Sequence, residues 1–168
     1  WASGGPAKVA VVSSALCGMV SGSSVGNTVT TGSVTIPMMK KTGYPPEFAG
    51  AVEAASSTGG QIMPPIMGAA AFLMAEMVGV PYADIIVRAI LPAFLYFLGI
   101  FLGVHFKAKK LGLKGLPKDE LPKWKRLLPK IYLLLPLILL VYMIVAGETM
   151  AKSAIYATIV AIAVSLIN

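Results

Sequence analysis

Two short polar stretches interrupt the apolar sequence of this chain, and both contain groups suited to binding an ion. Residues 21–32 read Ser-Gly-Ser-Ser-Val-Gly-Asn-Thr-Val-Thr-Thr-Gly, and residues 56–65 read Ser-Ser-Thr-Gly-Gly-Gln-Ile-Met-Pro-Pro. Neutral hydroxyl, amide and carbonyl oxygens are hard ligands, so they suit Na⁺ or a similar ion without trapping it. We therefore predict an ion site where the two stretches meet, with a solute site beside it.

Both predicted sites draw their residues from the two stretches. The candidate Na⁺ ligands are Ser21, Gly22, Ser23, Ser24, Asn27, Thr28, Thr58, Gly59, Gly60 and Pro64, with Ser57 beside them, and the candidate solute contacts are Ser24, Asn27, Gln61 and Pro65. An alternative stays open for any single hydroxyl group. Ser, Thr and Gly also line tight helix–helix contacts, and Gly18 and Gly22 have the spacing of such a contact.

The composition places these stretches in a membrane protein. Of the 168 residues, 57% are hydrophobic and 12% are charged, and the mean hydropathy is +0.80. Such a chain has too little charge to cover a surface that faces water. Charge-free runs at residues 9–39, 54–75, 89–104, 131–147 and 153–168 are candidate membrane segments. We predict an all-α integral membrane protein whose solvent is the lipid bilayer.

The net charge of +7 comes from a single tract. Residues 106–130 hold nine Lys and Arg and two acidic residues, so this tract carries +7 and the rest of the chain sums to zero. A basic tract between apolar spans is typical of a cytoplasmic loop. The tract also lacks the interleaved aromatic residues on which nucleic-acid bases stack. We therefore expect no nucleic-acid partner.

The polar stretches predict helix breaks at membrane depth. Glycines and short hydroxyl side chains at 21–32 compete with helix hydrogen bonding, and arms of about 12 to 15 residues are too short to span a bilayer. We predict a re-entrant hairpin at residues 8–41, which places Lys8 and the pair at 40–41 together on the cytoplasmic side. We predict a broken helix at residues 47–80, because two prolines inside it remove backbone donors.

The remaining apolar runs predict continuous spans. We expect transmembrane helices at residues 85–105, 131–147 and 153–168, the last of them truncated, with the basic cytoplasmic loop at 106–130 between the first two. The chain begins with Trp1 and ends with Asn168 inside an apolar run. We therefore expect it to be a piece of a longer polypeptide.

Ionisable residues elsewhere give weaker signals. Glu53 and Glu76 flank the break, and we expect them near the membrane interfaces, with a proton-carrying role as the alternative. His105 is the only histidine and lies beside the basic loop, so no base accompanies the hydroxyl groups. We expect no enzymatic activity, no catalytic residue, no cofactor and no metal site beyond the Na⁺ that serves as coupling ion.

The ordered motifs resemble the large membrane subunit of TRAP transporters (tripartite ATP-independent periplasmic transporters). The resemblance rests on Ser21-Gly-Ser-Ser24, Pro37-Met-Met, Gly43-Tyr44 and Gly59-Gly-Gln-Ile-Met-Pro-Pro65. The tract that runs from Lys109 to Pro117 looks most like the branch in which small and large membrane subunits are fused and a TAXI-type binding protein delivers the solute. One departure is Ile66, where many relatives have serine, which weakens any claim for a side-chain ligand there.

This resemblance implies Na⁺-driven uptake of organic anions (carboxylates) by an elevator-like motion, in the cytoplasmic (inner) membrane of a bacterium or archaeon. It implies that the chain is one half of an inverted-repeat transporter. It also implies two partners, which are a periplasmic solute-binding protein and the remainder of the permease chain, with its small-subunit region and second repeat. The alternatives are an H⁺-coupled carrier or an ion channel of another family, or a non-transporting structural membrane subunit.

Overall fold

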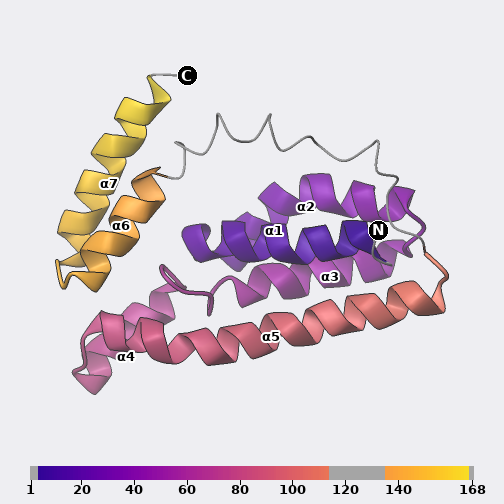
Figure 1. Cartoon of the computed structure of the whole chain (residues 1–168), viewed down its shortest axis with the longest axis horizontal. Coiled ribbons are helices and arrows are strands. Elements are labelled where there is room, and N and C mark those ends of the chain that lie inside the picture. The colour runs from indigo at the N-terminus through magenta and orange to yellow at the C-terminus, as the bar shows by residue number, and fades with distance from the viewer. Residues whose placement is uncertain (1–3, 114–134, 167–168) are drawn as a thin grey trace. The chain divides into compact units, whose positions relative to one another are not determined.

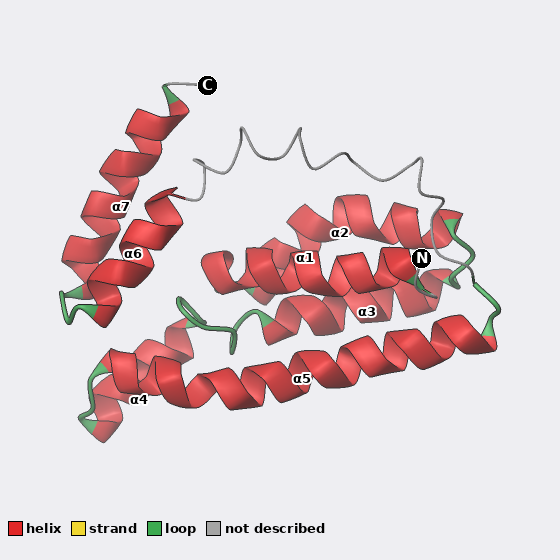
Figure 2. Cartoon of the chain, viewed as in Figure 1, coloured by secondary structure: helices red, strands yellow, loops and turns green. Residues whose placement is uncertain are grey.

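The computed structural model describes residues 4–113 and 135–166 of the chain (Figures 1 and 2). The described residues form helices joined by turns, and no strand occurs among them. The predicted all-α class is confirmed for this part of the chain. Two compact units are present: residues 1–80 with 84–120, and residues 81–83 with 121–168.

The first polar stretch separates two helices, α1 (Gly5–Ser21) and α2 (Ser24–Lys41). Gly22 ends α1 with a φ of 61°, a left-handed conformation that glycine adopts without strain. Ser23 then caps α2, because its side chain accepts a hydrogen bond from the Gly26 N–H at 3.2 Å. The two helices pack side by side as a hairpin (Figure 1).

The arms of this hairpin are longer than the sequence suggests. They have 17 and 18 residues, and only two residues separate them. Hydroxyl groups of α2 do not break it, because they donate to carbonyls of their own helix: Thr28 to Ser24 O and Thr30 to Gly26 O, both at 2.8 Å. The non-helical part of the first polar stretch is therefore confined to its beginning.

The second polar stretch separates α3 (Pro46–Gly59) from α4 (Ala69–Val78). We call the irregular residues 60–68 between them the break. Residues 56–59, which we expected inside the break, instead form the last turn of α3. The chain leaves that turn through bonds of the i to i−3 type, from the Gly60 N–H to Ser57 O and from the Gln61 N–H to Thr58 O, both at 3.1 Å.

Helix α5 (Tyr82–Lys110) contains the span that we predicted at 85–105. Its 29 residues rise about 44 Å. Of the described helices it alone is long and apolar enough to cross a membrane by itself. Its last turn includes three lysines of the predicted basic loop, while residues 114–130 of that loop lie outside the described part of the chain.

The core of the first unit lies where α1, α2 and α3 pack on one another (Figure 1). Small side chains dominate it, which lets the helix backbones approach closely. The fully buried core members are Ala7, Ala10, Met39, Ala49 and Ala108. The start of α1 and the end of α5 meet here, since Lys8 Nζ lies 3.0 Å from His105 Nδ1.

The second unit is a helical hairpin of α6 (Leu135–Val145) and α7 (Met150–Ser165). Gly147, with a φ of 84°, supports the turn between them, and Lys152 pairs with Glu148 across one helical turn at 2.7 Å. Helix α7 begins three residues before the span that we predicted. The ends of the predicted spans at 131–134 and 167–168 lie outside the described residues.

Glycines allow the α1–α2 hairpin to touch the break. A Cβ atom added to Gly18 would lie 2.6 Å from Gly60 Cα, and one added to Gly60 would lie 2.5 Å from Gly18 Cα. A Cβ atom on Gly22 would collide with the backbone carbonyl oxygen of Met67. Gly18 and Gly22, near the end of α1, therefore pack directly against the backbone of the break.

This contact generates the first prediction. Gly18→Ala should destabilise the protein by about 1–3 kcal/mol, because the added methyl group meets backbone that cannot move aside cheaply. Gly50→Ala is the matched control, since nothing lies within 4 Å of a Cβ atom there and alanine favours the helix. The measurement is thermal unfolding of the detergent-solubilised transporter. Equal melting temperatures for the two variants would contradict the close packing of α1 on the break.

Candidate functional site

The tip of the hairpin, residues 21–24, lies directly against the break. Gln61 Nε2 donates a hydrogen bond to Ser24 Oγ at 3.1 Å. Gln61 itself is held in place because its backbone carbonyl accepts from the Gly68 N–H at 2.8 Å, which closes the break into a loop. The structure thus brings together the two polar stretches that the sequence singled out.

A second link lies deeper, one turn inside α2. Asn27 is 1% exposed, and its Nδ2 donates to Ser14 O at 2.9 Å and to Ser57 Oγ at 3.1 Å. One amide therefore joins α1, α2 and α3. Its Oδ1 atom is buried and accepts no hydrogen bond within the described part of the chain. A buried acceptor without a partner is costly, so this oxygen is available to a ligand.

The carboxyl group of Glu53 lies farther from the tip than Asn27, beside Thr31 and Thr35 of α2. Its side chain is fully buried. The Oε1 atom accepts from Ser14 Oγ at 2.6 Å, from Ser57 Oγ at 3.2 Å and, in a short contact, from Thr31 Oγ1. The Oε2 atom makes a short contact with Thr35 Oγ1. Four hydroxyl groups from three helices thus surround one carboxyl group; we call these five residues the Glu53 cluster.

Sequence reasoning placed Glu53 near a membrane interface, and the structure instead buries it between helices. A signal for this was present in the sequence. Asn27, Thr31 and Thr35 recur every four residues, which places three polar side chains on one face of α2. Glu53 and Ser57 have the same spacing on α3. Glu76, in contrast, is exposed on α4.

The other candidate ligands lie in less direct positions. Ser21 and Ser23 are exposed at the tip, where Ser23 also caps α2. Thr28 and Thr58 each donate to a carbonyl of their own helix, at 2.8 Å. Gly59 faces α5, because a Cβ atom there would meet the rings of Tyr96 and Phe97, the nearest at 2.6 Å.

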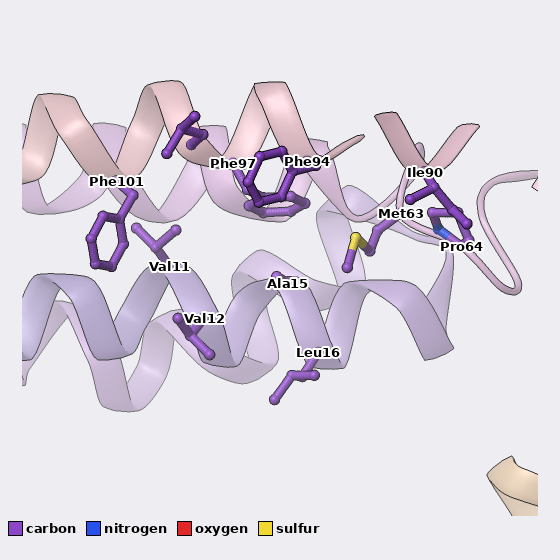
Figure 3. A pocket seen from close by; sticks show the side chains of 11 residues that line it. Val11, Val12, Ala15, Leu16, Met63, Pro64, Ile90, Phe94, Phe97 and Phe101 are labelled. Atoms are coloured by element: carbon purple, nitrogen blue, oxygen red, sulfur yellow. The ribbon is translucent and has the colours of Figure 1, made fainter. Parts of the chain in front are cut away.

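The predicted ligand Pro64 borders an apolar pocket of about 420 Å³ (Figure 3). The pocket lies between α1, the break and α5, and its lining includes Val11, Leu16, Met63, Phe94 and Phe101. Among the described residues, no charged side chain and no side-chain hydroxyl or amide lines it. A carboxylate would lose its hydration there without compensation, so this pocket does not suit an organic anion.

Helix ends supply the electrostatics of the site. Helices α1 and α3 end at the tip and at the break, and α2 and α4 begin there. Helix C-termini present carbonyl oxygens and partial negative charge, whereas N-termini present N–H groups and partial positive charge. The same small region therefore offers oxygen ligands for a cation and donors for an anion.

A hairpin and a broken helix that join at their polar interruptions define a class of protein, the membrane permease with discontinuous helices. The chain matches the DctM component of the tripartite ATP-independent periplasmic transporters over residues 1–168. It therefore belongs to the family of TRAP transporter large permease subunits. The family implies a multi-pass bacterial membrane protein.

Two curated relatives show how much of such a subunit the chain represents. It is 30% identical to the uncharacterized protein y4mL of Sinorhizobium fredii over 98% of this chain and 39% of that protein. It is 31% identical to the C4-dicarboxylate TRAP transporter large permease protein DctM of Vibrio cholerae over 76% of this chain and 27% of that protein. The chain thus spans well under half the length of these relatives. No solved structure was found to match it.

The Glu53 cluster generates the second prediction. Ser57→Ala removes a donor to Glu53 and an acceptor for Asn27, both buried, so it should lower the free energy of unfolding by about 1–3 kcal/mol. Thr58→Ala is the neighbouring control, because Thr58 is exposed and bonds only its own helix, and it should stay within about 0.5 kcal/mol of the wild type. Thermal or denaturant unfolding of the purified transporter measures both. A Ser57→Ala protein as stable as Thr58→Ala would contradict the network.

Proposed function

We propose that this chain forms the ion-binding half of a Na⁺-coupled permease that imports organic anions. The observation that carries the proposal is the contact between the tip and the break, where four helix ends and two polar stretches meet. Carbonyl oxygens at the ends of α1 and α3 and the orphan Oδ1 atom of Asn27 supply hard ligands for Na⁺. The candidate side-chain ligands at the tip add to this set.

The solute carboxylate is proposed to bind next to this ion. The first turn of α2 offers N–H groups and the Ser24 hydroxyl, and Gln61 reaches the same place from the break. Bound Na⁺ would hold the tip against the break and so complete the anion-binding surface. Solute binding then depends on Na⁺, which is what coupling requires.

Topology and partners follow from the same proposal. The α1–α2 hairpin is re-entrant and opens toward the cytoplasm, since Lys8, Lys40 and Lys41 lie at its open end, on the side of the basic loop. The permease lies in the inner membrane, and the rest of its chain, with a second repeat, completes the site. A periplasmic binding protein of the TAXI type delivers the solute.

The third prediction concerns uptake by the complete permease, reconstituted in liposomes with its binding protein and a panel of organic carboxylates. An inward Na⁺ gradient should drive uptake, and a K⁺ gradient should not. Ser24→Ala should raise the Na⁺ concentration for half-maximal uptake about tenfold, which corresponds to the loss of one well-placed polar contact.

Thr30→Ala is the matched control for this experiment. Thr30 of α2 is exposed, and its hydroxyl group donates to Gly26 O of its own helix at 2.8 Å. It should keep the wild-type Na⁺ dependence. Na⁺-independent uptake by the wild type would contradict the ion site. Equal Na⁺ dependence of uptake in Ser24→Ala and Thr30→Ala would show that Ser24 is not part of that site.

A further inference from the structure

We propose that the pocket between α1, the break and α5 is a binding site for an anionic phospholipid of the cytoplasmic leaflet, with one acyl chain in the pocket and the headgroup at Lys8 (Figure 3). This inference rests on the proposed orientation of the hairpin, whose open end faces the cytoplasm. It does not depend on which ion or solute the permease carries.

The pocket is the inner part of a longer apolar groove between α1 and α5. It follows α5 from Ile90 to Phe101, a rise of about 17 Å (Figure 3). A second hollow of about 320 Å³ shares Val12, Leu16 and Phe101 with the pocket and extends to Lys8. The two hollows therefore form one groove, which begins near the open end of the hairpin and reaches the break.

The dimensions of the pocket fit a single hydrocarbon chain. Each leaflet supplies about half of the ~30 Å hydrocarbon core, so a length of about 17 Å suits an acyl chain that runs from the interface to the midplane. A volume of about 420 Å³ over this length gives a mean cross-section of about 25 Å². An α-helix about 10 Å across has a cross-section of about 80 Å² and is too wide to enter.

The walls of the groove exclude water and admit lipid. The pocket is lined by apolar side chains, so a water molecule would not find there the polar partners that it needs. One side of the groove is open, since Val12, Leu16 and Phe94 are 50%, 54% and 60% exposed. An acyl chain can therefore enter sideways from the bilayer and replace contacts that an empty hollow would lack.

Basic side chains mark the end of the groove where the headgroup lies. Lys8 Nζ lies 5.1 Å from the centroid of the Phe101 ring and 3.0 Å from His105 Nδ1. With the Lys8 ammonium donating to Nδ1, the His105 proton lies on Nε2 and can be donated to a phosphate oxygen. Lys109 follows His105 by one turn on the same face of α5. Among the described residues none of the three pairs with a carboxylate, so together they favour a lipid of net negative charge.

The inner end of the groove contacts the break. Met63 and Pro64 line the pocket there, while no residue of the tip does. A bound acyl chain packs against the break beside the candidate ligand Pro64. The lipid thus supports the break without taking part in the contact between the tip and the break.

The headgroup site is tested on the complete permease, purified in detergent and titrated with phosphatidylglycerol or with phosphatidylcholine of the same acyl chains. Native mass spectrometry counts the bound lipids. The wild type should bind phosphatidylglycerol at least about fivefold more tightly, as expected for a lysine near the headgroup. Lys8→Gln should weaken phosphatidylglycerol binding about fivefold and leave phosphatidylcholine binding unchanged. Lys40→Gln is the matched control, because Lys40 lies at the same end of the hairpin and lines neither hollow.

The acyl-chain site is tested by Val12→Trp in the same experiment. Val12 lies at the exposed edge of both hollows, so an indole ring there fills the groove. Binding of both lipids should weaken about tenfold, because the chain and the ring compete for the same space. Leu102→Trp is the matched control and should bind both lipids as the wild type does, since Leu102 is 43% exposed on α5 and lines neither hollow.

Several outcomes would overturn the proposal. Equal affinity of the wild type for the two lipids, or equal losses in Lys8→Gln and Lys40→Gln, would reject the headgroup site. Unchanged lipid binding in Val12→Trp would show that another part of the permease covers the groove, and would reject the acyl-chain site.

A labelling experiment decides the matter if Val12→Trp does not fold. Phosphatidylglycerol with a photoactivatable group at the end of one acyl chain should label residues 61–65 or 90–101 of the wild type, and labelling only elsewhere would overturn the proposal. Both measurements record binding without transport. A permease that binds phosphatidylglycerol as predicted but takes up no solute would therefore contradict the proposed function and leave the lipid site intact.

Discussion

The arrangement of α1, α2 and α3 depends on one constraint, the burial of the Glu53 carboxyl group, which has no cationic partner in the described part of the chain. Such a group is tolerated only when its hydrogen-bonding capacity is met. Ser14 must come from α1, two threonines from α2 and Ser57 from α3, so the carboxyl fixes the rotation of all three helices about their axes. Tight packing follows, because these short side chains reach the carboxyl only when the backbones are close.

Small residues make this close packing possible, both beside Glu53 and near the tip. Gly32 lets α2 approach Glu53, and the contact of Gly18 with Gly60 brings the end of α1 onto the break. Asn27 connects the two levels through Ser57. A short polar column thus runs from Glu53 to the place where four helix ends meet. We propose that ion binding at the tip acts on the packing of the hairpin against the broken helix through this column of hydrogen bonds.

The sequence predicts the kind of elements well and their extent poorly. Glycine, proline and hydroxyl clusters marked both interruptions, and charge-free runs indicated the apolar helices. The hairpin loop proved much shorter than its polar stretch, because hydroxyls such as Thr28 bond back to their own helix and do not end it. The sequence shows which side chains can compete for backbone hydrogen bonds. The packing of neighbouring helices decides whether those side chains end the helix.

The position of Glu53 required information that no single segment contains. Its partners are 39, 22 and 18 residues away in Ser14, Thr31 and Thr35, and hydroxyls of this kind are equally common in packing contacts. The spacing of four residues along α2 indicated a polar face but not the residue that it would meet. The contact between the tip and the break was easier to predict. Two polar breaks at similar membrane depth have unpaired backbone groups, and few other partners are present for them there.

An experimental structure of the complete permease, solved once in NaCl and once in choline chloride, would show whether the tip and the break together hold a cation. We predict an ion in the Na⁺ structure that is coordinated by oxygens from both the tip and the break, and a tip that separates from the break in choline. Identical structures in the two salts, with no ion between residues 21–24 and 60–68, would contradict it.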